Sequence, residues 1–406
     1  MTGDTAWLMI STGLVLFMVP GLALFYGGMV RTKNVLNMLN MNLYCLGAVP
    51  IVWAIVAESM STGDGDHKWF GFLSFGTAWM NGVTDVVDGS SEPGTMALWA
   101  FFLTFAVITP ALISGAVADR MKFSAWMIFV PVWIVLVYCP VSFWVYGGWA
   151  HALPAYDTAG GTAIHINAGV AALALVTVLG KRKGWPAEGW PPHNLPLVVL
   201  GTGILFMGWF GFNSGGQDFA GQAMVNTFLA GATGMIAWMV AEMVKLGKPT
   251  TLGICSGVVA GLVAITPAAT FVGSMTAILF GLLAGIICFF AIQLKDKFGY
   301  DDALDVVGIH MVGGIIGGLL LGLTASTKPF GEGAFELEAG GELFLNQLIS
   351  IVVVMVFSFV MTFLIAKALD LTIGLRVSAE NEQRGLDTTE HAETAYQFGA
   401  SGMERR

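Results

Sequence analysis

The sequence predicts an all-α integral membrane protein that crosses the bilayer eleven times. Three observations lead to this fold class: the composition, the number of long apolar stretches, and the distribution of basic residues among the loops. Of the 406 residues, 56% are hydrophobic and only 11% are charged, whereas soluble domains carry about 25% charged residues. The mean hydropathy is +0.75. These values are typical of a chain whose surface faces lipid.

Eleven apolar stretches approach or exceed the roughly 20 residues that a helix needs to cross the hydrocarbon core. The first has no basic segment before it and is longer than a signal-peptide core, so we expect a retained helix. The chain contains 53 glycines, which favour close helix packing in lipid. The predicted spans cover residues 5–28, 35–58, 96–118, 123–147, 160–180, 194–214, 222–244, 250–268, 272–294, 304–325 and 342–369.

The four cysteines all lie inside these stretches. They show neither a CxxC pair nor a metal-binding spacing, so we expect packing residues without disulfides and without a metal site. The net charge of −9 is spread over the loops and gives no sign of nucleic-acid binding. The cysteines are Cys45, Cys139, Cys255 and Cys288.

The loops alternate between a basic and an acidic kind. The basic loops are "VRTKN", "DRMK", "GKRKG", "KLGK" and "KDK", and of the 18 Lys and Arg residues only Lys68 and Lys328 fall outside the basic side. Basic loops mark the cytoplasmic face. We therefore predict an N-terminus outside, a transmembrane domain over 1–369, and a cytoplasmic tail over 370–406.

The spans are predicted to form two inverted repeats of five helices. Because five is odd, a second copy of the unit enters the membrane upside down, as in many transporters. The repeats would cover about 5–180 and 194–325, with a final helix at 342–369. Span five reads "GTAIHINAGVAA" and span ten reads "DVVGIHMVGGIIGG", and each places a histidine four residues before a glycine.

These two histidines, His165 and His310, are the only ones of six that lie well inside spans. Inversion would bring both near the midplane, where transporter substrates bind. Two unrelated core histidines are the alternative, but ionisable residues are costly in the membrane and mark function more often. Two neutral rings that share a hydrogen bond in an apolar lumen suit a small neutral molecule, or a cation that sheds a proton on entry.

Acidic and aromatic residues gather at the predicted outer ends of the spans. Asp157 begins span five, where we expect it to be the N-cap residue and also to attract cations. The segments "FWVYGGWAH" and "GWFGFNSGG" supply aromatic rings there. Such rings hold ammonium-like cations by cation–π attraction; an interfacial aromatic belt is the alternative.

Five segments, in order along the chain, resemble the prokaryotic Amt branch of the Amt/MEP/Rh ammonium transporter family. They are "GLALFYGGMVRTKN", "DTAGGTAIHINAG", "GWFGFNSG", "DVVGIHMVGG" and "DLTIGLRVSAENEQRGLDTTEHAETAYQF". The resemblance implies an eleven-helix subunit of a homotrimer in the cell (inner, cytoplasmic) membrane, with one narrow pore per subunit. It implies a transporter rather than an enzyme, and we expect no cofactor.

The resemblance also implies roles for individual residues. His165 and His310 match the twin histidines that line the pore, and Phe105 and Phe212 match a phenylalanine gate. Ammonium would be recruited outside and deprotonated near the gate, and ammonia would pass along the histidines. The residues assigned to the outer vestibule and to cation recruitment are Asp157, Phe101, Tyr146, Trp149 and Gly216.

Two positions depart from the family pattern. The vestibule usually has a tryptophan where this chain has Tyr146, and a serine where it has Gly216. Tyrosine keeps a π face and adds a hydroxyl, whereas glycine removes a hydrogen-bond partner. We therefore expect an outer site that is weaker or differently arranged, with Trp149 or water as a substitute partner.

The tail and the overall function each leave alternatives. The resemblance implies a tail that folds against the cytoplasmic face and couples subunits, where a PII-type nitrogen regulator binds; a disordered terminus is the alternative. Besides transport, an ammonium sensor (transceptor) that signals through its tail fits the sequence. An intramembrane hydrolase using His165 and Asp157 is disfavoured because neither a GxSxG nor an HExxH motif is present.

Overall fold

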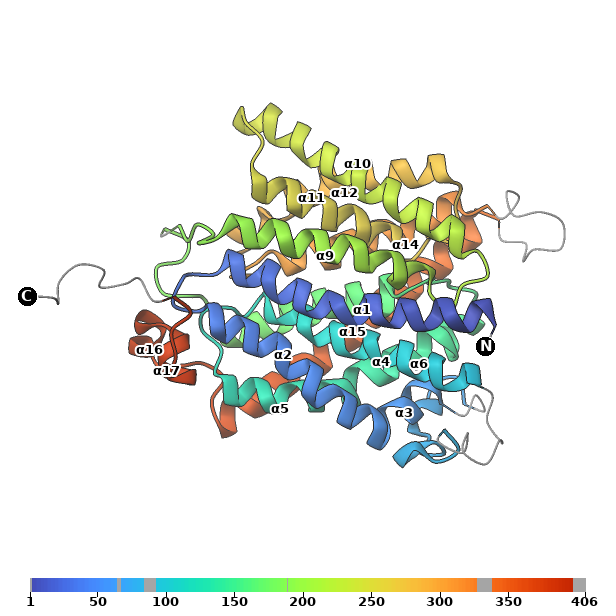
Figure 1. Cartoon of the computed structure of the whole chain (residues 1–406), viewed down its shortest axis with the longest axis horizontal. Coiled ribbons are helices and arrows are strands. Elements are labelled where there is room, and N and C mark those ends of the chain that lie inside the picture. Colours follow the sequence, from blue (N-terminus) through green and yellow to red (C-terminus); the bar gives the residue numbers. More distant parts are fainter. Residues whose placement is uncertain (1, 64–66, 84–92, 188, 327–337, 397–406) are drawn as a thin grey trace, which may run out of the picture.

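The computed structural model describes residues 2–63, 67–83, 93–187, 189–326 and 338–396. Lys328 and the last ten residues of the predicted tail lie outside these ranges. Over the described residues the protein is helical, with two isolated β-bridges and no strand. Figure 1 shows an elongated bundle of helices that run along a common direction. The chain starts at one end of the bundle, and the tail helices lie at the other.

Ten helical segments of the described chain are long and apolar enough to cross a membrane. Four of them contain a π-helical turn, namely η1 (Trp53–Ala57), η5 (Ile134–Tyr138), η6 (Gly161–Ile166) and η7 (Val307–Met311). In chain order the ten are α1 (Gly3–Met29), α2–η1–α3 (Val35–Thr62), α4 (Pro93–Ser114), α5–η5–α6–α7 (Phe123–Ala152), η6–α8 (Gly161–Leu179), α9 (Leu195–Ser214), α10 (Ala220–Leu246), α12–α13 (Ser274–Phe298), η7–α14 (Val307–Thr324) and α15 (Gly341–Thr372).

The eleventh predicted stretch, 250–268, corresponds to the shorter helix α11 (Thr251–Ile265). Its 15 residues rise roughly 22 Å, less than the hydrocarbon core of about 30 Å. The Thr250 hydroxyl caps its start by accepting a bond from Gly253 N. Its end falls just before Pro267, which has no backbone N–H to donate within the helix. The cap and the proline lie at the two ends of α11.

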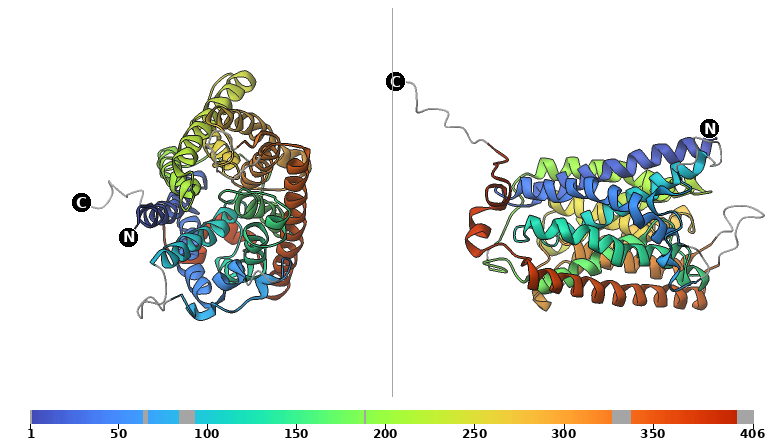
Figure 2. Two further views of the ribbon diagram at one scale, coloured as in Figure 1. Left: turned by 90° about the vertical axis from the view of Figure 1, so that its right-hand side faces the viewer. Right: turned by 90° about the horizontal axis from the view of Figure 1, so that it is seen from below.

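Glycines allow the helices to approach closely, as the composition indicated. A Cβ on Gly261 of α11 would lie 2.1 Å from the Ala230 carbonyl oxygen of α10, and a Cβ on Gly281 of α12 would lie 2.3 Å from the same atom. The four cysteines are free and buried. Helix α15 runs along one flank of the bundle (Figure 2), where it packs against α8 and α14.

A buried ionic cluster joins the loops at the end where the tail lies. Arg182 binds Asp301 at 2.8 Å and Asp119 at 3.4 Å, and all three side chains are buried. Burial raises the pKa of Asp301, but the bonds from Arg182 and the charge of Arg120 outweigh burial and lower it. Asp301 therefore stays ionised, and the cluster ties the loop after α8 to the loop before η7.

The tail folds against this end of the bundle through two short helices, α16 (Ala379–Arg384) and α17 (Leu386–His391). Leu386 is completely buried. Its backbone N–H donates to Asn34 Oδ1 at 2.8 Å, and Asp387 Oδ1 accepts a bond from Asn37 N at 2.9 Å. Over its described residues the tail is therefore packed rather than disordered.

We predict that Leu386→Ala releases the tail without unfolding the bundle. The change removes a fully buried side chain, which costs about 2–4 kcal/mol of local stability. Limited proteolysis should then cut the chain beyond Asp370 several times faster than in the unmodified protein. The matched control is Leu371→Ala, because Leu371 is 82% exposed. Equal cleavage rates in the two variants would contradict the docked tail.

Candidate functional site

The helices that carry His165 and His310 cross at two glycines. A Cβ on Gly169 would lie 2.4 Å from Met311 N, and a Cβ on Gly314 would lie 2.7 Å from Ile166 Cγ1. Met311 and Ile166 each directly follow one of the histidines. Gly169 therefore packs against Met311, the residue after His310, and Gly314 packs against Ile166, the residue after His165. These two contacts bring the imidazole rings together.

The two imidazoles form a buried pair. His310 Nδ1 and His165 Nδ1 are 3.3 Å apart, the ring centroids are 5.3 Å apart, and the planes are inclined by 22°. The exposed fractions are 1% for His165 and 4% for His310. Because one Nδ1 must donate and the other must accept, neutral rings in this contact have different tautomers. Both histidines lie in π-helical turns, η6 and η7, a feature often found at functional sites.

The histidine pair lines a narrow, apolar cavity. Its volume of about 10 Å³ is near the minimum for a single water molecule. His165 Nε2 is buried there without a partner among the described residues. The other lining residues are Met18, Leu22, Phe25, Ile108, Leu112, Leu205, Trp209, Phe212 and Val259.

A stack of phenylalanines continues from His165. The rings of His165 and Phe212 are 5.8 Å apart and nearly parallel, and Phe212 meets Phe105 edge-on at 4.5 Å. Phe105 in turn meets Phe101 at 4.8 Å. Phe105 and Phe212 are both buried. The predicted gate residues therefore lie between the histidine pair and the outer cavity.

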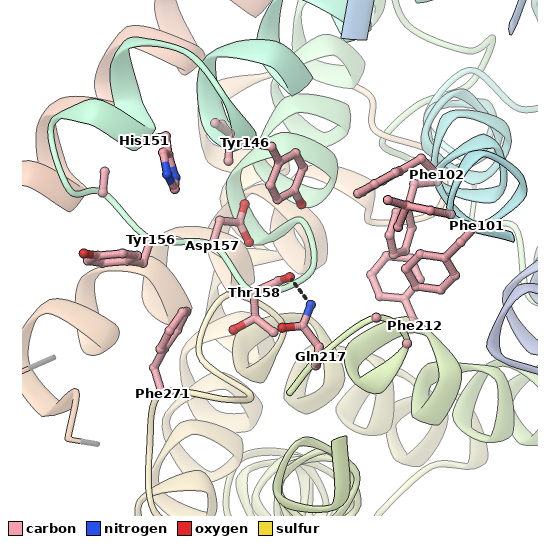
Figure 3. Close-up of a pocket in the computed structure, with 16 residues that line it drawn as sticks. Phe101, Phe102, Tyr146, His151, Tyr156, Asp157, Thr158, Phe212, Gln217 and Phe271 are labelled. Carbon is pink, nitrogen blue, oxygen red and sulfur yellow. Dashed lines mark hydrogen bonds between the residues drawn. The ribbon is translucent and has the colours of Figure 1, made fainter. Parts of the chain in front are cut away.

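A cavity of about 210 Å³ opens beyond these phenylalanines; we call it the outer cavity because the loop charges predict that this end of the bundle faces outward. Figure 3 shows Phe101, Phe102 and Phe212 on one side of it, and His151, Tyr156 and Phe271 on the other. Between them lie Tyr146, Asp157, Thr158 and Gln217, with Gly216 also in the wall.

The Asp157 carboxylate caps η6 from a distance. Oδ1 accepts bonds from Gly160 N at 2.8 Å and Gly161 N at 2.7 Å, and Oδ2 accepts from Thr162 N at 2.8 Å and Ala163 N at 3.1 Å. The prediction that Asp157 is itself the N-cap residue is wrong. That position belongs to Gly160, whose φ of 108° turns the backbone so that the carboxylate can reach back to it.

Asp157 is also the charged group of the outer cavity. Burial raises its pKa, and the four backbone bonds act in the opposite direction without cancelling the effect. The Asp157 carboxylate caps the start of η6 and also borders the cavity. Its orientation in the cavity is therefore fixed by the backbone amides that it binds.

The structure places four of the five predicted vestibule residues in the cavity wall. These are Phe101, Tyr146, Asp157 and Gly216. Trp149 is the exception: it is absent from the described lining, and its ring stacks on Trp69 at 4.7 Å. Trp149 is the first residue of the four-residue helix α7, and its ring packs on Trp69, which lies in the segment after α3 (Glu58–Thr62).

Several lining residues were missed by sequence reasoning. Thr158 and Tyr156 flank Asp157 and Gln217 follows Gly216, so adjacency could have suggested them. Phe271 follows α11 on a distant loop and carries no local signal. The missed residues are Phe102, His151, Tyr156, Thr158, Gln217 and Phe271, with Leu98, Val145, Ala155 and Gly215 completing the wall.

With this geometry established, similarity to known proteins identifies the chain. The model of the Ammonium Transporter Family matches residues 6–396. The chain belongs to this family. It is 46% identical to the ammonium transporter of Mycobacterium bovis, over 98% of this chain and 91% of that protein. It is 45% identical to the ammonium transporter of Aquifex aeolicus, over 97% and 93%.

Two solved structures share the fold of this chain. The crystal structure of Candida albicans Mep2 has a TM-score of 0.85 and 32% identity, and the match covers 93% of this chain and 87% of that chain. A structure titled "Sensor Amt Protein" has a TM-score of 0.87 at 23% identity, over 96% and 98%, which is a likeness of fold alone. This ammonium transporter family member is an integral membrane protein, as its family and the ten long apolar helices of its described residues indicate.

We predict that Gly169→Ala destabilises the protein and separates the histidines. The new methyl group would overlap Met311 N, and overpacking of this kind costs roughly 1–3 kcal/mol. Thermal unfolding in detergent should show a lower midpoint. Gly203→Ala in α9 is the control, because a Cβ there meets nothing within 4 Å. A Gly169→Ala midpoint equal to that of the control would contradict the close crossing.

Proposed function

We propose that this protein transports ammonium across the cell membrane by passing ammonia along the His165–His310 pair. The contact between the two Nδ1 atoms at 3.3 Å, at the end of a phenylalanine stack, is the observation that carries the proposal. Membership of the ammonium transporter family supplies the substrate class. The proposed steps follow from the charge and polarity of the outer cavity, the phenylalanine gate and the histidine pair.

The outer cavity would recruit the cation. Ammonium carries a positive charge and four N–H donors, so it is favoured by a carboxylate and by aromatic faces. Asp157 supplies the charge, and Phe101 and Tyr146 lie in the same wall. The carboxylate oxygens already accept four backbone bonds, so Asp157 would act through its field rather than as a direct ligand.

Deprotonation would occur at the phenylalanine gate. Phe105 and Phe212 meet at 4.5 Å, so a ring must swing aside before a molecule can pass. The cavity behind them is apolar and narrow, and an unpaired charge there would cost several kcal/mol of desolvation. Ammonia, which is neutral, crosses without that cost, and the histidine pair offers polar atoms to it.

The proton would follow along the two imidazoles. A neutral ring accepts a proton at one nitrogen and releases one from the other. His165 Nε2 is buried without a partner among the described residues, and His165 Nδ1 lies 3.3 Å from His310 Nδ1. The histidine pair can therefore transfer a proton from the phenylalanine gate toward the predicted cytoplasmic end of the pore.

We further propose the topology given by the loop charges: eleven crossings including α11, an N-terminus outside, and a tail from 370 onward inside. The reciprocal contacts of Gly169 and Gly314 support two inverted repeats, at about 5–180 and 194–325, with α15 as the extra helix. A homotrimer, and a PII-type regulator docking on the tail face, rest on the family resemblance.

Electrical recording on the reconstituted protein tests the transport proposal. We expect an ammonium-evoked current that Asp157→Ala abolishes, because the cavity loses its charge and η6 loses its cap. Asp218→Ala should retain most of the current, because Asp218 is an exposed neighbour outside the cavity wall. Ammonium binding without current in the unmodified protein would instead indicate a sensor.

His165→Ala tests the relay separately. We expect the variant to assemble normally and either to lose flux or to change its ion selectivity, because the remaining ring cannot pass a proton alone. The measurements are size-exclusion chromatography and current in ammonium, potassium and sodium. If the variant has the same current and the same ion selectivity as the unmodified protein, the histidines do not relay protons.

A further inference from the structure

His165 has no charged partner among the described residues. Its one side-chain hydrogen bond there is the contact with His310 Nδ1 at 3.3 Å, and the described lining of the narrow cavity holds no carboxylate. In the proposed relay His165 briefly carries a proton on both nitrogens, and it loses this positive charge when its Nδ1 proton passes to His310. Because an unpaired charge is costly in an apolar site, the relay needs a group that stabilises the imidazolium.

Two aromatic rings lie nearly parallel to the imidazole of His165. The ring of Trp209 is 5.3 Å away between centroids with the planes inclined by 19°, and the ring of Phe212 is 5.8 Å away at 28°. A cation within about 6 Å of an aromatic centroid is attracted by the negative face of the ring, and tryptophan attracts it most strongly. Phe212 has to swing aside as part of the proposed gate, so Trp209 is the better candidate for a lasting partner.

The indole of Trp209 is held in place by a hydrogen bond to the neighbouring helix. Trp209 Nε1 in α9 donates to Thr266 Oγ1 at 2.9 Å, and the Thr266 hydroxyl donates to the Leu262 carbonyl of α11 at 2.8 Å. Both side chains are buried. If the ring turned away from His165, it would leave a buried donor without a partner, which is costly.

We propose that Trp209 stabilises the charged state of His165 during proton transfer, and that Thr266 is a positioning residue for the Trp209 ring. The inference rests on the proposed function and adds a residue that acts on the proton alone. Neutral ammonia carries no charge for the indole face to stabilise. Loss of Trp209 should therefore impair proton transfer more than the passage of ammonia.

Trp133 offers a matched control for the loss of a buried indole. Its Nε1 donates to Thr362 Oγ1 at 2.9 Å, the same distance as in the Trp209–Thr266 pair. Trp133 is buried, and it is absent from the described linings of the outer and the narrow cavity. Trp133→Leu and Trp209→Leu each remove a buried ring and its hydrogen bond to a threonine, but only Trp209→Leu removes a ring beside His165.

Current and nitrogen uptake, measured on the same proteoliposomes, test the proposal. We expect Trp209→Leu to lower the ammonium-evoked current about threefold to thirtyfold, the range that a desolvated cation–π contact covers. Uptake of ¹⁵N-labelled ammonium should fall less, so the ratio of charge to nitrogen should drop. In Trp133→Leu the ratio should equal that of the unmodified protein, because a general packing defect lowers both fluxes together.

Conservative variants grade the effect. Trp209→Phe keeps a weaker π face and should give a ratio between those of the unmodified protein and Trp209→Leu. Thr266→Val leaves the indole N–H without its acceptor and should lower the ratio, whereas Thr266→Ser keeps the hydroxyl and should restore it. If Trp209→Leu does not assemble, the comparison of Thr266→Val with Thr362→Val provides the same test.

Equal charge-to-nitrogen ratios in Trp209→Leu and Trp133→Leu would overturn the assignment, because Trp209 would then contribute packing only. A second readout does not need flux: solid-state NMR of ¹⁵N-histidine at low pH should show a weaker imidazolium signal from His165 in Trp209→Leu than in Trp133→Leu. Equal signals would also count against the role of Trp209. If the unmodified protein carries no current, the transport proposal fails and the NMR comparison alone decides on Trp209.

Discussion

The close crossing of two helices at Gly169 and Gly314 is the constraint on which the rest of the site depends. Any side chain at either glycine would push apart the segments that carry His165 and His310. With both glycines in place, the imidazoles meet through their Nδ1 atoms inside an apolar wall. The phenylalanine stack and the outer cavity then line up on one side of this contact. In an apolar, narrow space of this kind a neutral molecule is more stable than an unpaired ion, which is the basis of the proposed transport of ammonia.

Asp157 links the architecture of the outer end to its chemistry. The same carboxylate that satisfies the free amides at the start of η6 also sets the charge of the cavity. Because the backbone holds it, the charge sits at a defined place, and the aromatic residues and Tyr146 are arranged around it. The position of the carboxylate in the cavity and the position of His165 are therefore not independent, since both depend on how η6 begins.

Much of this arrangement could be predicted from the sequence, because apolar stretches of similar length recur along the chain and the spacing from histidine to glycine occurs in two of them. Hydropathy predicted eleven spans, and ten helices of the described residues are long and apolar enough to cross a membrane. The matching spacing of His165–Gly169 and His310–Gly314 indicated an inverted repeat that brings the two histidines together. What failed depends on local chain direction. Asp157 was misassigned as the N-cap residue because Gly160 redirects the backbone. Helix α11 begins where its apolar stretch does but ends at Ile265, three residues before the stretch ends. Phe271 reaches the cavity from the turn after α11 and His151 from the four-residue helix α7, and neither segment leaves a periodic signal in the sequence. The ring of Trp149 stacks on Trp69 instead of lining the cavity.

The tautomers of the two histidines test the central claim most directly, because a shared Nδ1–Nδ1 hydrogen bond forces them to differ. Solid-state NMR of protein labelled with ¹⁵N-histidine in lipid, assigned with single-histidine variants, reports which nitrogen of each ring carries the proton. The account predicts that one of His165 and His310 is protonated at Nδ1 and the other at Nε2, with a correlation between the two Nδ1 atoms. Two identical tautomers without that correlation would contradict it.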